Sequence, residues 1–158
     1  DHEGHGGWTA FELAWGRAMD GTDGIFSWLE RNPADFILLH AGTNDLVNTD
    51  ERDLEDILDE IDRWENSANG NPVTVVLAKI IDRVPNEPKV SSLNNAVAAM
   101  VSNRSNDNII VVDQQTGAGI NYAIGADMSD WLHPDRGGYN KMANLWFDGL
   151  APLMDKCP

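Results

Sequence analysis

Three short apolar runs alternate with longer segments of helical periodicity along the 158-residue chain. The runs lie at residues 36–40, 73–78 and 108–113, and each has the length of a β-strand that is buried on both faces. Apolar residues that recur every three or four positions predict helices around these strands. We expect helices from Thr9, as N-cap, through Ala18 and over residues 25–31, 50–66, about 90–101 and 137–154.

The alternation of helix and strand predicts the fold class. Continuous apolar strands separated by helices are typical of an α/β protein in which helices cover both faces of a parallel sheet. The length fits one domain spanning residues 1–158, and the chain contains no repeat and no low-complexity tract. Three strands make a small sheet for this class, so we expect further strands on the N-terminal side.

Composition and charge narrow the classes of partner. Apolar residues make up 42% and charged residues 23% of the chain, which is typical of a globular protein. Eleven Lys and Arg face 26 Asp and Glu, and the formal charge of −15 would repel nucleic acid and anionic membranes. A neutral substrate fits this field. Many extracellular proteins are equally acidic, and we expect this one to be secreted.

Three polar clusters lie where an open parallel sheet places its site, beyond the carboxyl ends of the strands. Asn44 follows the first predicted strand, and Asp130 and His133 lie in the long loop at residues 114–136, after the third. Gly6 and Gly7 lead into the first helix. The loops that carry these residues are therefore candidates for one site.

Asp130 and His133 are spaced as an orienting carboxylate and a general base. The carboxylate can accept one imidazole N–H, fix the tautomer and stabilise the imidazolium, which leaves the other ring nitrogen to accept a proton. The competing interpretation is a surface loop that happens to hold two polar residues.

Other polar residues also have two interpretations. The Asn44 amide can donate to an oxyanion, or it can serve an Asx-type turn after the strand. His40 ends a predicted strand, and we expect either a satisfied core histidine or one that supports a residue of the site. His2 and His5 have the spacing of a metal pair, but zinc needs at least one more ligand, so loop structure is favoured over a metal site.

Three segments together resemble a known family. Residues 5–9 (HGGWT), 41–45 (AGTND) and 130–134 (DWLHP) resemble the second, third and fifth sequence blocks of the SGNH, or GDSL-type, hydrolases, in the same order. The string at residues 1–9 (DHEGHGGWT) is most similar to carbohydrate esterase family 3, the acetyl xylan esterases. The resemblance covers essentially the whole chain.

The resemblance implies a fold and a mechanism. The fold would be a three-layer α/β/α sandwich with a flavodoxin-like parallel sheet, and the activity a serine esterase that removes acetyl groups from a carbohydrate such as acetylated xylan. His133 would be general base and then general acid, and Asp130 would orient it. Asn44 and Gly7 would donate to the oxyanion, with Gly6 in place of Gly7 if the alignment shifts by one residue. No cofactor or metal is implied.

The sequence departs from the family at the nucleophile. The G-D-S-[LI] block is absent, and none of the seven serines follows a predicted strand in that context. Ser129 is adjacent to Asp130 and therefore poorly placed to complete a triad with His133. We expect these residues to be a C-terminal fragment of an SGNH hydrolase that begins just after its serine block.

A fragment of this kind needs a companion. Without a neighbouring strand, residues 36–40 would leave an exposed apolar edge. A companion N-terminal polypeptide of the same protein would cover that edge and supply the serine, bound without a covalent link or through Cys157. The alternative for Cys157 is a stray reduced thiol.

Two questions stay open from sequence. Trp8 and Trp131 flank the site motifs and could stack on sugar rings, but packing in the core or loop explains them equally well. The substrate could be another ester, such as a lipid or aryl ester, although the lack of a long apolar lid argues against a lipase. The alternative from another class is a non-catalytic carbohydrate-binding or interaction module that has lost the serine.

Overall fold

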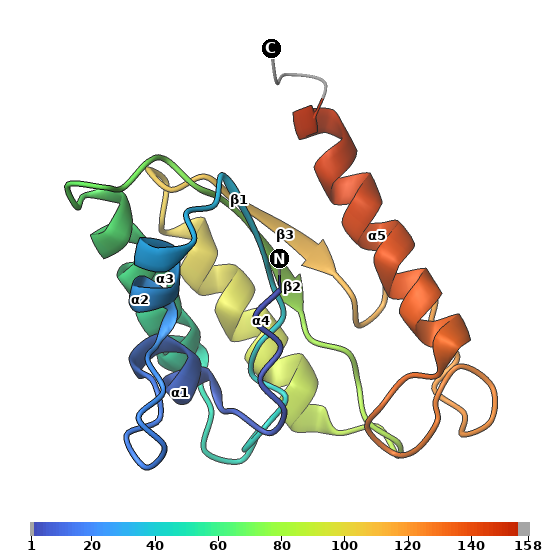
Figure 1. Cartoon of the computed structure of the whole chain (residues 1–158). Coiled ribbons are helices and arrows are strands. Elements are labelled where there is room, and N and C mark those ends of the chain that lie inside the picture. Colours follow the sequence, from blue (N-terminus) through green and yellow to red (C-terminus); the bar gives the residue numbers. More distant parts are fainter. Residues whose placement is uncertain (1, 155–158) are drawn as a thin grey trace. The chain divides into compact units, whose positions relative to one another are not determined.

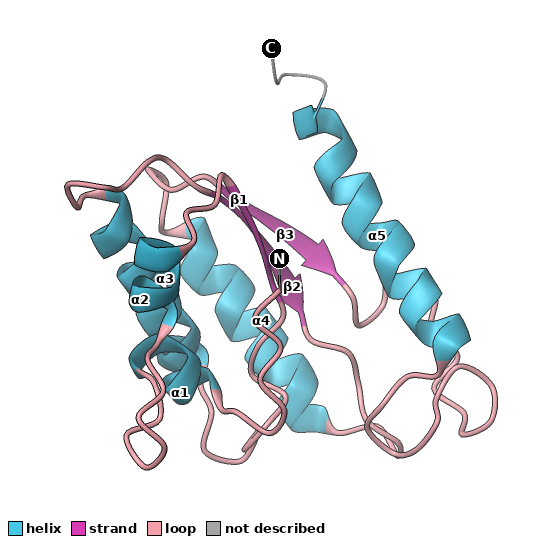
Figure 2. Cartoon of the chain, viewed as in Figure 1, coloured by secondary structure: helices cyan, strands magenta, loops and turns pink. Residues whose placement is uncertain are grey.

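The computed structural model describes residues 2–154. Cys157 lies outside the described residues. Figure 1 traces the chain and Figure 2 separates its helices from its strands. The elements in chain order are α1 (Ala10–Trp15), α2 (Ile25–Arg31), β1 (Phe36–Leu39), α3 (Glu51–Glu65), β2 (Thr74–Lys79), α4 (Pro88–Ser102), β3 (Ile109–Asp113) and α5 (Arg136–Met154). None of the helices described is both long and apolar enough to span a bilayer.

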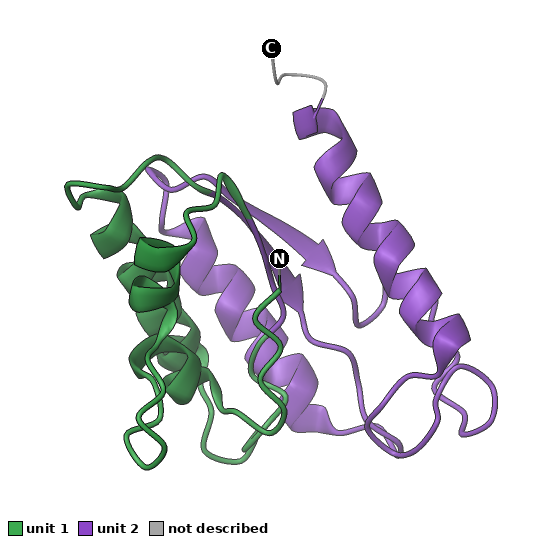
Figure 3. Cartoon of the chain, in the orientation of Figure 1, with its two compact units in different colours: residues 1–36, 41–73 green, residues 37–40, 74–158 purple. Residues whose placement is uncertain are grey.

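The chain divides into two compact units (Figure 3). Unit 1 comprises residues 1–36 and 41–73 and holds α1, α2 and α3. Unit 2 comprises residues 37–40 and 74–158 and holds the sheet with α4 and α5.

The sheet of unit 2 has the strand order β1-β2-β3. Its strands are parallel, and the pairing of β2 with β3 runs from Val75 opposite Ile109 to Lys79 opposite Asp113. A parallel sheet needs crossover connections, which the intervening helices provide. The predicted α/β class with a parallel sheet is therefore confirmed.

Helices α4 and α5 lie on opposite sides of this sheet (Figure 1). The face toward α5 is apolar and is made by Val76, Ala78 and Val112, against Leu145, Trp146 and Leu150 of the helix. Gly149 allows the close approach of α5, because a Cβ there would lie 2.9 Å from the Cγ1 atom of Val112.

A buried amide attaches α4 to the end of β2. The Oδ1 atom of Asn94 accepts the Ile80 N–H at 2.8 Å, and its Nδ2 atom donates to the Ile80 carbonyl at 2.9 Å. Asn94 is only 3% exposed, so this pair of bonds satisfies backbone groups that would otherwise be buried without partners. It fixes the point at which β2 ends and its following loop begins.

Unit 1 is built around the amphipathic helix α3. The apolar stripe expected for residues 50–66 is confirmed, because each of its members is at most 2% exposed: Leu54, Ile57, Leu58, Ile61 and Trp64. Asp50 caps the helix by accepting the Arg52 N–H, while the side chain of Asp53 accepts the Asp50 N–H. Both α1 and α2 pack on α3.

The first helix is shorter than predicted. It ends at Trp15 rather than continuing through Ala18, because Gly16 takes a φ of 85° and its N–H returns to the Glu12 carbonyl. A Cβ at Gly16 would lie 2.4 Å from the Thr22 carbonyl oxygen, so the turn needs glycine for both its backbone angle and its space. The apolar residues beyond Trp15 have helical spacing, which is why the sequence pattern predicted a longer helix.

Two predictions of burial are also wrong. The first strand was expected to be buried on both faces, but Phe36 and Leu38 are 36% and 47% exposed and alternate with more protected neighbours. An edge strand has fewer neighbours than a central one, which an apolar run alone does not reveal. The apolar positions of residues 137–154 also predict that Tyr139, Met142 and Ala143 are buried. On α5, Tyr139 is 52% exposed and Ala143 is also exposed, whereas Met142 is buried as predicted.

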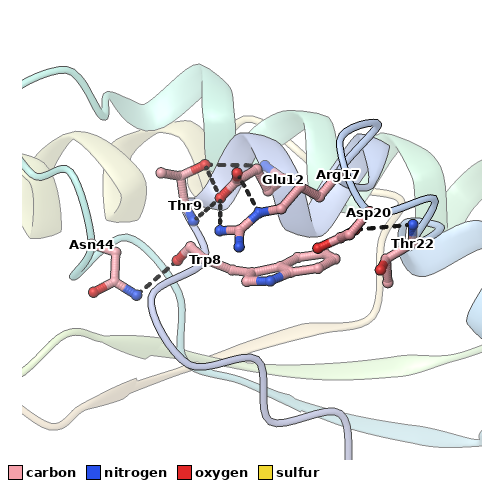
Figure 4. Close-up of polar contacts among 7 residues, drawn as sticks. All are labelled: Trp8, Thr9, Glu12, Arg17, Asp20, Thr22 and Asn44. Carbon is pink, nitrogen blue, oxygen red and sulfur yellow. Dashed lines mark hydrogen bonds and ion pairs between the residues drawn. The ribbon is translucent and has the colours of Figure 1, made fainter.

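Helix α1 begins with a reciprocal cap that recruits an arginine (Figure 4). The Thr9 hydroxyl accepts the Glu12 N–H, and the Glu12 carboxylate accepts the Thr9 N–H at 2.9 Å. Arg17 donates two hydrogen bonds to the same carboxylate, at 2.8 and 3.0 Å. The Arg17 guanidinium, followed by the Thr9 N–H, lowers the pKa of Glu12 from 4.5 to about 2.

We expect Glu12→Gln to destabilise the protein only where this carboxylate is charged. Its pKa is lower in the folded chain than in the unfolded chain, so its contribution is full above about pH 4.5 and disappears as the pH falls toward 2. Denaturant unfolding at pH 7, 4 and 3 measures this, with Glu51→Gln in the first turn of α3 as control. An equal loss of stability at all three pH values would contradict the assignment.

Candidate functional site

The Asp130–His133 pair forms as predicted, in the loop of unit 2 before α5. The Oδ2 atom of Asp130 lies 2.9 Å from the Nδ1 atom of His133. A carboxylate can only accept hydrogen bonds, so Nδ1 carries the proton. In the neutral ring this leaves Nε2 with a lone pair, and the His133 side chain is 63% exposed, which lets that nitrogen meet a substrate.

Backbone donors hold the carboxylate in place. The Oδ1 atom of Asp130 accepts the N–H groups of Leu132 and His133, each at 2.7 Å. Hydrogen bonds from the His133 N–H, the His133 imidazole and the Leu132 N–H lower the pKa of Asp130 from 3.8 to about 2. Asp130 is therefore charged throughout the range in which a histidine base works.

The loop that carries the pair is attached to α5 by a partly buried ion pair. Asp127 accepts the Lys141 ammonium and the Asn121 N–H, both at 2.6 Å, and the Lys141 ammonium also donates to the Gly119 carbonyl at 3.0 Å. Lys141, with Asn121, lowers the pKa of Asp127 below its ordinary value. These contacts anchor the loop at residues upstream of Asp130.

Ser129 makes contacts that point away from a catalytic role. Its hydroxyl lies 3.4 Å from the Pro134 carbonyl, to which it donates, and its N–H donates to the His133 carbonyl at 2.8 Å. Both bonds close the turn around Asp130 and His133. The structure thus gives Ser129 a part in forming the loop.

Gly7 lies in a tight turn of unit 1. The Trp8 N–H donates to the His5 carbonyl at 3.3 Å, and Gly7 has a φ of 79° at the third position of that turn. This angle is typical of the third residue of a type II turn, which favours glycine. Gly6 occupies the second position of the same turn and has no positive φ.

Asn44 lies in a second turn of the same unit, which follows β1. Gly42 and Asp45 adopt positive φ values of 104° and 52°, and the Thr49 hydroxyl donates to the carbonyl of Asp45 at 3.1 Å. The Nδ2 atom of Asn44 donates to the Trp8 carbonyl at 2.8 Å. An amide carries two N–H groups, so one remains to donate to another acceptor.

Trp8 connects these two turns (Figure 4). Its carbonyl accepts from Asn44, and its ring lies beneath the Arg17 guanidinium at 5.0 Å and 4.2 Å from the His5 ring. Trp8 is 8% exposed, which favours packing over sugar stacking for this residue.

An open cavity of about 460 Å³ lies in the same unit, and Glu12, Arg17 and Asp45 are among the residues that line it.

The structure brings the predicted residues together in two pairs. Asp130 contacts His133 in unit 2, and Asn44 contacts the residue that follows Gly7 in unit 1. That all four face one cleft stays a prediction, as do their catalytic roles. Trp131 is 53% exposed, in contrast to Trp8.

Two other histidines were singled out from the sequence, His40 and His5, and the structure departs from the expectation for His40. The Nε2 atom of His40 is enclosed and has no hydrogen-bond partner among the described residues, so the expectation of a satisfied core histidine is wrong. Burial lowers the pKa of His40 to about 4, which keeps the ring neutral at pH 7. His5 bonds to Glu3 at 3.1 Å, and within residues 2–154 no three potential metal ligands gather.

Sequence reasoning missed the residues that support each pair. Glu12 and Arg17 are five positions apart across the end of a helix, and their pairing depends on the Gly16 turn. Asp127 and Lys141 are fourteen positions apart, across the loop and the start of α5. Charge and spacing gave no signal for either pair, because most acidic residues of this chain lie on solvated surface.

Comparison with known proteins places the chain in a family. Residues 17–146 match the GDSL-like lipase/acylhydrolase family. A multidomain esterase of Ruminococcus flavefaciens is 28% identical over 172 residues, which cover 95% of this chain. The chain spans only 20% of that relative's length.

Solved structures share the fold. A carbohydrate esterase family 3 protein from Talaromyces cellulolyticus matches with a TM-score of 0.80 and 22% identity, over 100% of this chain and 73% of that one. A serine-to-alanine mutant of an acetyl esterase, crystallised with an acetate ion, matches with a TM-score of 0.78 and 24% identity, over 98% of this chain and 72% of that one. With the family match over residues 17–146, the chain belongs to the GDSL-like lipase/acylhydrolase family.

Proposed function

We propose that this chain is the part of a secreted serine esterase that holds the base and the oxyanion donors, and that the enzyme deacetylates a carbohydrate such as acetylated xylan. The observation that carries the proposal is the hydrogen bond between Asp130 Oδ2 and His133 Nδ1 in a D-x-x-H loop. The likeness in fold between this chain and a carbohydrate esterase and an acetyl esterase supports an acetylated carbohydrate as the substrate. A polysaccharide substrate lies outside the cell, which is why we propose secretion.

The first half-reaction forms an acyl-enzyme. The Nε2 atom of His133 takes the proton of a serine hydroxyl as the serine oxygen attacks the ester carbonyl. The negative charge that develops on the carbonyl oxygen accepts hydrogen bonds from the free Asn44 amide N–H and the Gly7 N–H. The tetrahedral species then collapses, and protonated His133 gives its proton to the departing sugar oxygen.

The second half-reaction releases acetate. His133 takes a proton from water as the water oxygen attacks the acetyl-serine, and the same donors stabilise the second oxyanion. Return of the proton from His133 to the serine oxygen regenerates the enzyme. Asp130 remains a carboxylate in both steps, where it holds the imidazole tautomer and stabilises the imidazolium.

We propose that the serine comes from a G-D-S segment of the same protein outside these 158 residues. The support is that the sequence holds no G-D-S block, while the chain covers 72% of the acetyl esterase mutant in which alanine replaces a serine. Such a segment would also act as the companion that pairs with the edge of β1.

His133→Ala is expected to reduce kcat on an acetyl ester by on the order of 10⁴-fold or more in the protein expressed from its complete reading frame, because no other group can take the serine proton. Hydrolysis of 4-nitrophenyl acetate measures this. His2→Ala, which removes an exposed histidine, serves as the matched control and should leave turnover unchanged. Near-normal turnover by His133→Ala would refute the mechanism.

Asn44→Ala is expected to lower kcat by about 10² to 10³, the usual loss for one oxyanion donor, with a smaller change in KM. The amide acts mainly in the transition state, so substrate binding is affected less than turnover. Asn48→Ala is the control within the same turn, since the Asn48 amide donates to the Asp45 carboxylate. A loss confined to KM would argue against the oxyanion role.

The 158-residue chain alone is expected to hydrolyse acetyl esters far more slowly than the protein from the complete reading frame. Donors and binding can act without a nucleophile, but they supply only a small part of triad catalysis. Adding the G-D-S segment as a separate polypeptide should raise the rate, and its serine-to-alanine variant should not. Full activity of the chain, shown to be intact and alone by mass, would instead point to one of its own serines.

A further inference from the structure

One aromatic residue of unit 2 lies within the catalytic motif itself. Trp131 stands between Asp130 and His133 and is 53% exposed, whereas Trp28 and Trp64 are 8% and 0% exposed. Two residues of chain span at most about 7 Å, so the Cα atom of Trp131 lies within about that distance of the Cα atom of His133. A single exposed aromatic residue needs no explanation by itself, so the following contacts decide its role.

The backbone of Trp131 is fixed from two sides. The Asp130 carboxylate accepts the N–H groups of Leu132 and His133, the two residues that follow it. The Trp131 carbonyl accepts the Val84 N–H at 2.9 Å. The loop before α5 is therefore bonded to the loop that follows β2, and Trp131 is at the junction.

Arg83, adjacent to Val84, lies over the indole. Its guanidinium carbon is 5.7 Å from the centre of the Trp131 ring, which is within the range of a cation–π contact. Trp131 remains 53% exposed in spite of this contact. Arginine also carries N–H donors arranged in a plane, so the pair presents an apolar face beside a polar edge.

The turn that carries Arg83 is rigidly built around a buried carboxylate. Asp82 is 6% exposed and accepts the N–H groups of Arg83 and Glu87 at 2.8 and 3.0 Å, as well as a bond from the Asn86 amide. Its carboxylate also accepts the Gln115 amide at 3.2 Å. These bonds leave the backbone at Arg83 little freedom.

The same turn is attached to the loop after β3. The Tyr122 hydroxyl accepts the Asp82 N–H at 3.2 Å and donates to the Gln115 carbonyl at 2.8 Å. Burial raises the pKa of Tyr122, so this hydroxyl keeps its proton. Trp131 and Arg83 are thus held by loops that are joined before any ligand binds, which reduces the entropy lost on binding.

We infer that Trp131, with Arg83 beside it, is the platform on which the sugar ring that carries the acetyl group stacks. The inference rests on the proposed esterase function and names the part of the substrate that this site selects. A pyranose ring offers an apolar C–H face to an indole, and its hydroxyl oxygens can accept from the guanidinium. A neutral sugar also enters a field of −15 without repulsion.

A lipid chain fits these residues less well. An alkyl chain gains most from an enclosed apolar groove, whereas Trp131 is exposed and has Asp130, His133 and Arg83 as neighbours. A rigid planar face with polar groups at its edge instead matches a ring that is apolar on one face and hydroxylated at its rim. The observations therefore favour a glycan ester over a lipid ester.

The test compares two substrates in the protein expressed from its complete reading frame. Trp131→Ala should lower kcat/KM for an acetylated xylo-oligosaccharide by about tenfold or more, the effect of losing one stacked aromatic contact, and mainly through KM. For 4-nitrophenyl acetate, which has no sugar ring, the change should stay within about twofold. Trp131→Phe should be intermediate on the oligosaccharide.

Trp15→Ala is the matched control. Trp15 is 51% exposed and its indole N–H donates to Asp56 within unit 1, so it tests the loss of an equally exposed indole outside the motif. It should change neither substrate. Arg83→Met should reduce activity on the oligosaccharide alone. An equal loss on both substrates in Trp131→Ala, or none on either, would overturn the inference.

A binding measurement separates this inference from the proposed function. The indole N–H resonance of Trp131, assigned by its absence in Trp131→Phe, should shift saturably as a deacetylated xylo-oligosaccharide is added. If His133→Ala keeps full activity while this signal shifts, the esterase mechanism fails and the sugar platform stands. If His133→Ala is inactive and the signal does not move, the platform is wrong and the esterase stands.

Discussion

The site depends on how a single carboxylate distributes its hydrogen bonds. One oxygen of Asp130 accepts two successive backbone N–H groups and the other accepts the imidazole of His133. The backbone bonds fold the chain into the turn that brings residue 133 back over residue 130. The same ionised group thus makes the loop and orients the base, so neither function can be altered without the other. These same hydrogen bonds lower the pKa of Asp130, because they stabilise its charged form.

Irregular loops can hold such geometry only when their own polar groups are satisfied. The long segment before α5 has no regular secondary structure, and its shape comes from the Asp127–Lys141 ion pair and from its bonds to the loop after β2. Asp82 plays the corresponding part for that second loop. Buried or half-buried carboxylates that accept backbone N–H groups replace the hydrogen bonds that a helix or strand would supply.

Much of the fold could be predicted from sequence because hydrophobic periodicity reports it directly. The parallel strands, the stripe of α3 and the pairing of Asp130 with His133 all follow from local patterns of a few residues. The end of α1 and the exposure of Phe36 could not be predicted in this way. The first depends on the approach of the Thr22 carbonyl to Gly16, and the second on which strand lies at an edge.

The site could be predicted in its motif residues but not in its supports. Asp130, His133, Asn44 and Gly7 are recognisable because the proposed chemistry would fix their types and their spacing. Arg83 has no such spacing, since its contact with Trp131 joins two loops that are far apart in sequence. Which residues support the motif depends on how the loops approach one another in three dimensions. A pattern of residues along the sequence does not reveal that approach.

Some of the acidic residues in this chain have a structural role in addition to their contribution to the net charge. The carboxylates that shape the candidate site, Asp130 and Glu12, are each saturated with N–H donors, and the pKa of each falls to about 2. These donors stabilise the charged form of each carboxylate, and the charge of Asp130 also faces the imidazole of His133. The rest of the acidic surface excludes polyanions at a distance, while the exposed indole two residues before His133 in the chain, Trp131, is in contact with the Arg83 guanidinium. A neutral, ring-shaped ester, the substrate class that we propose, meets both conditions at once.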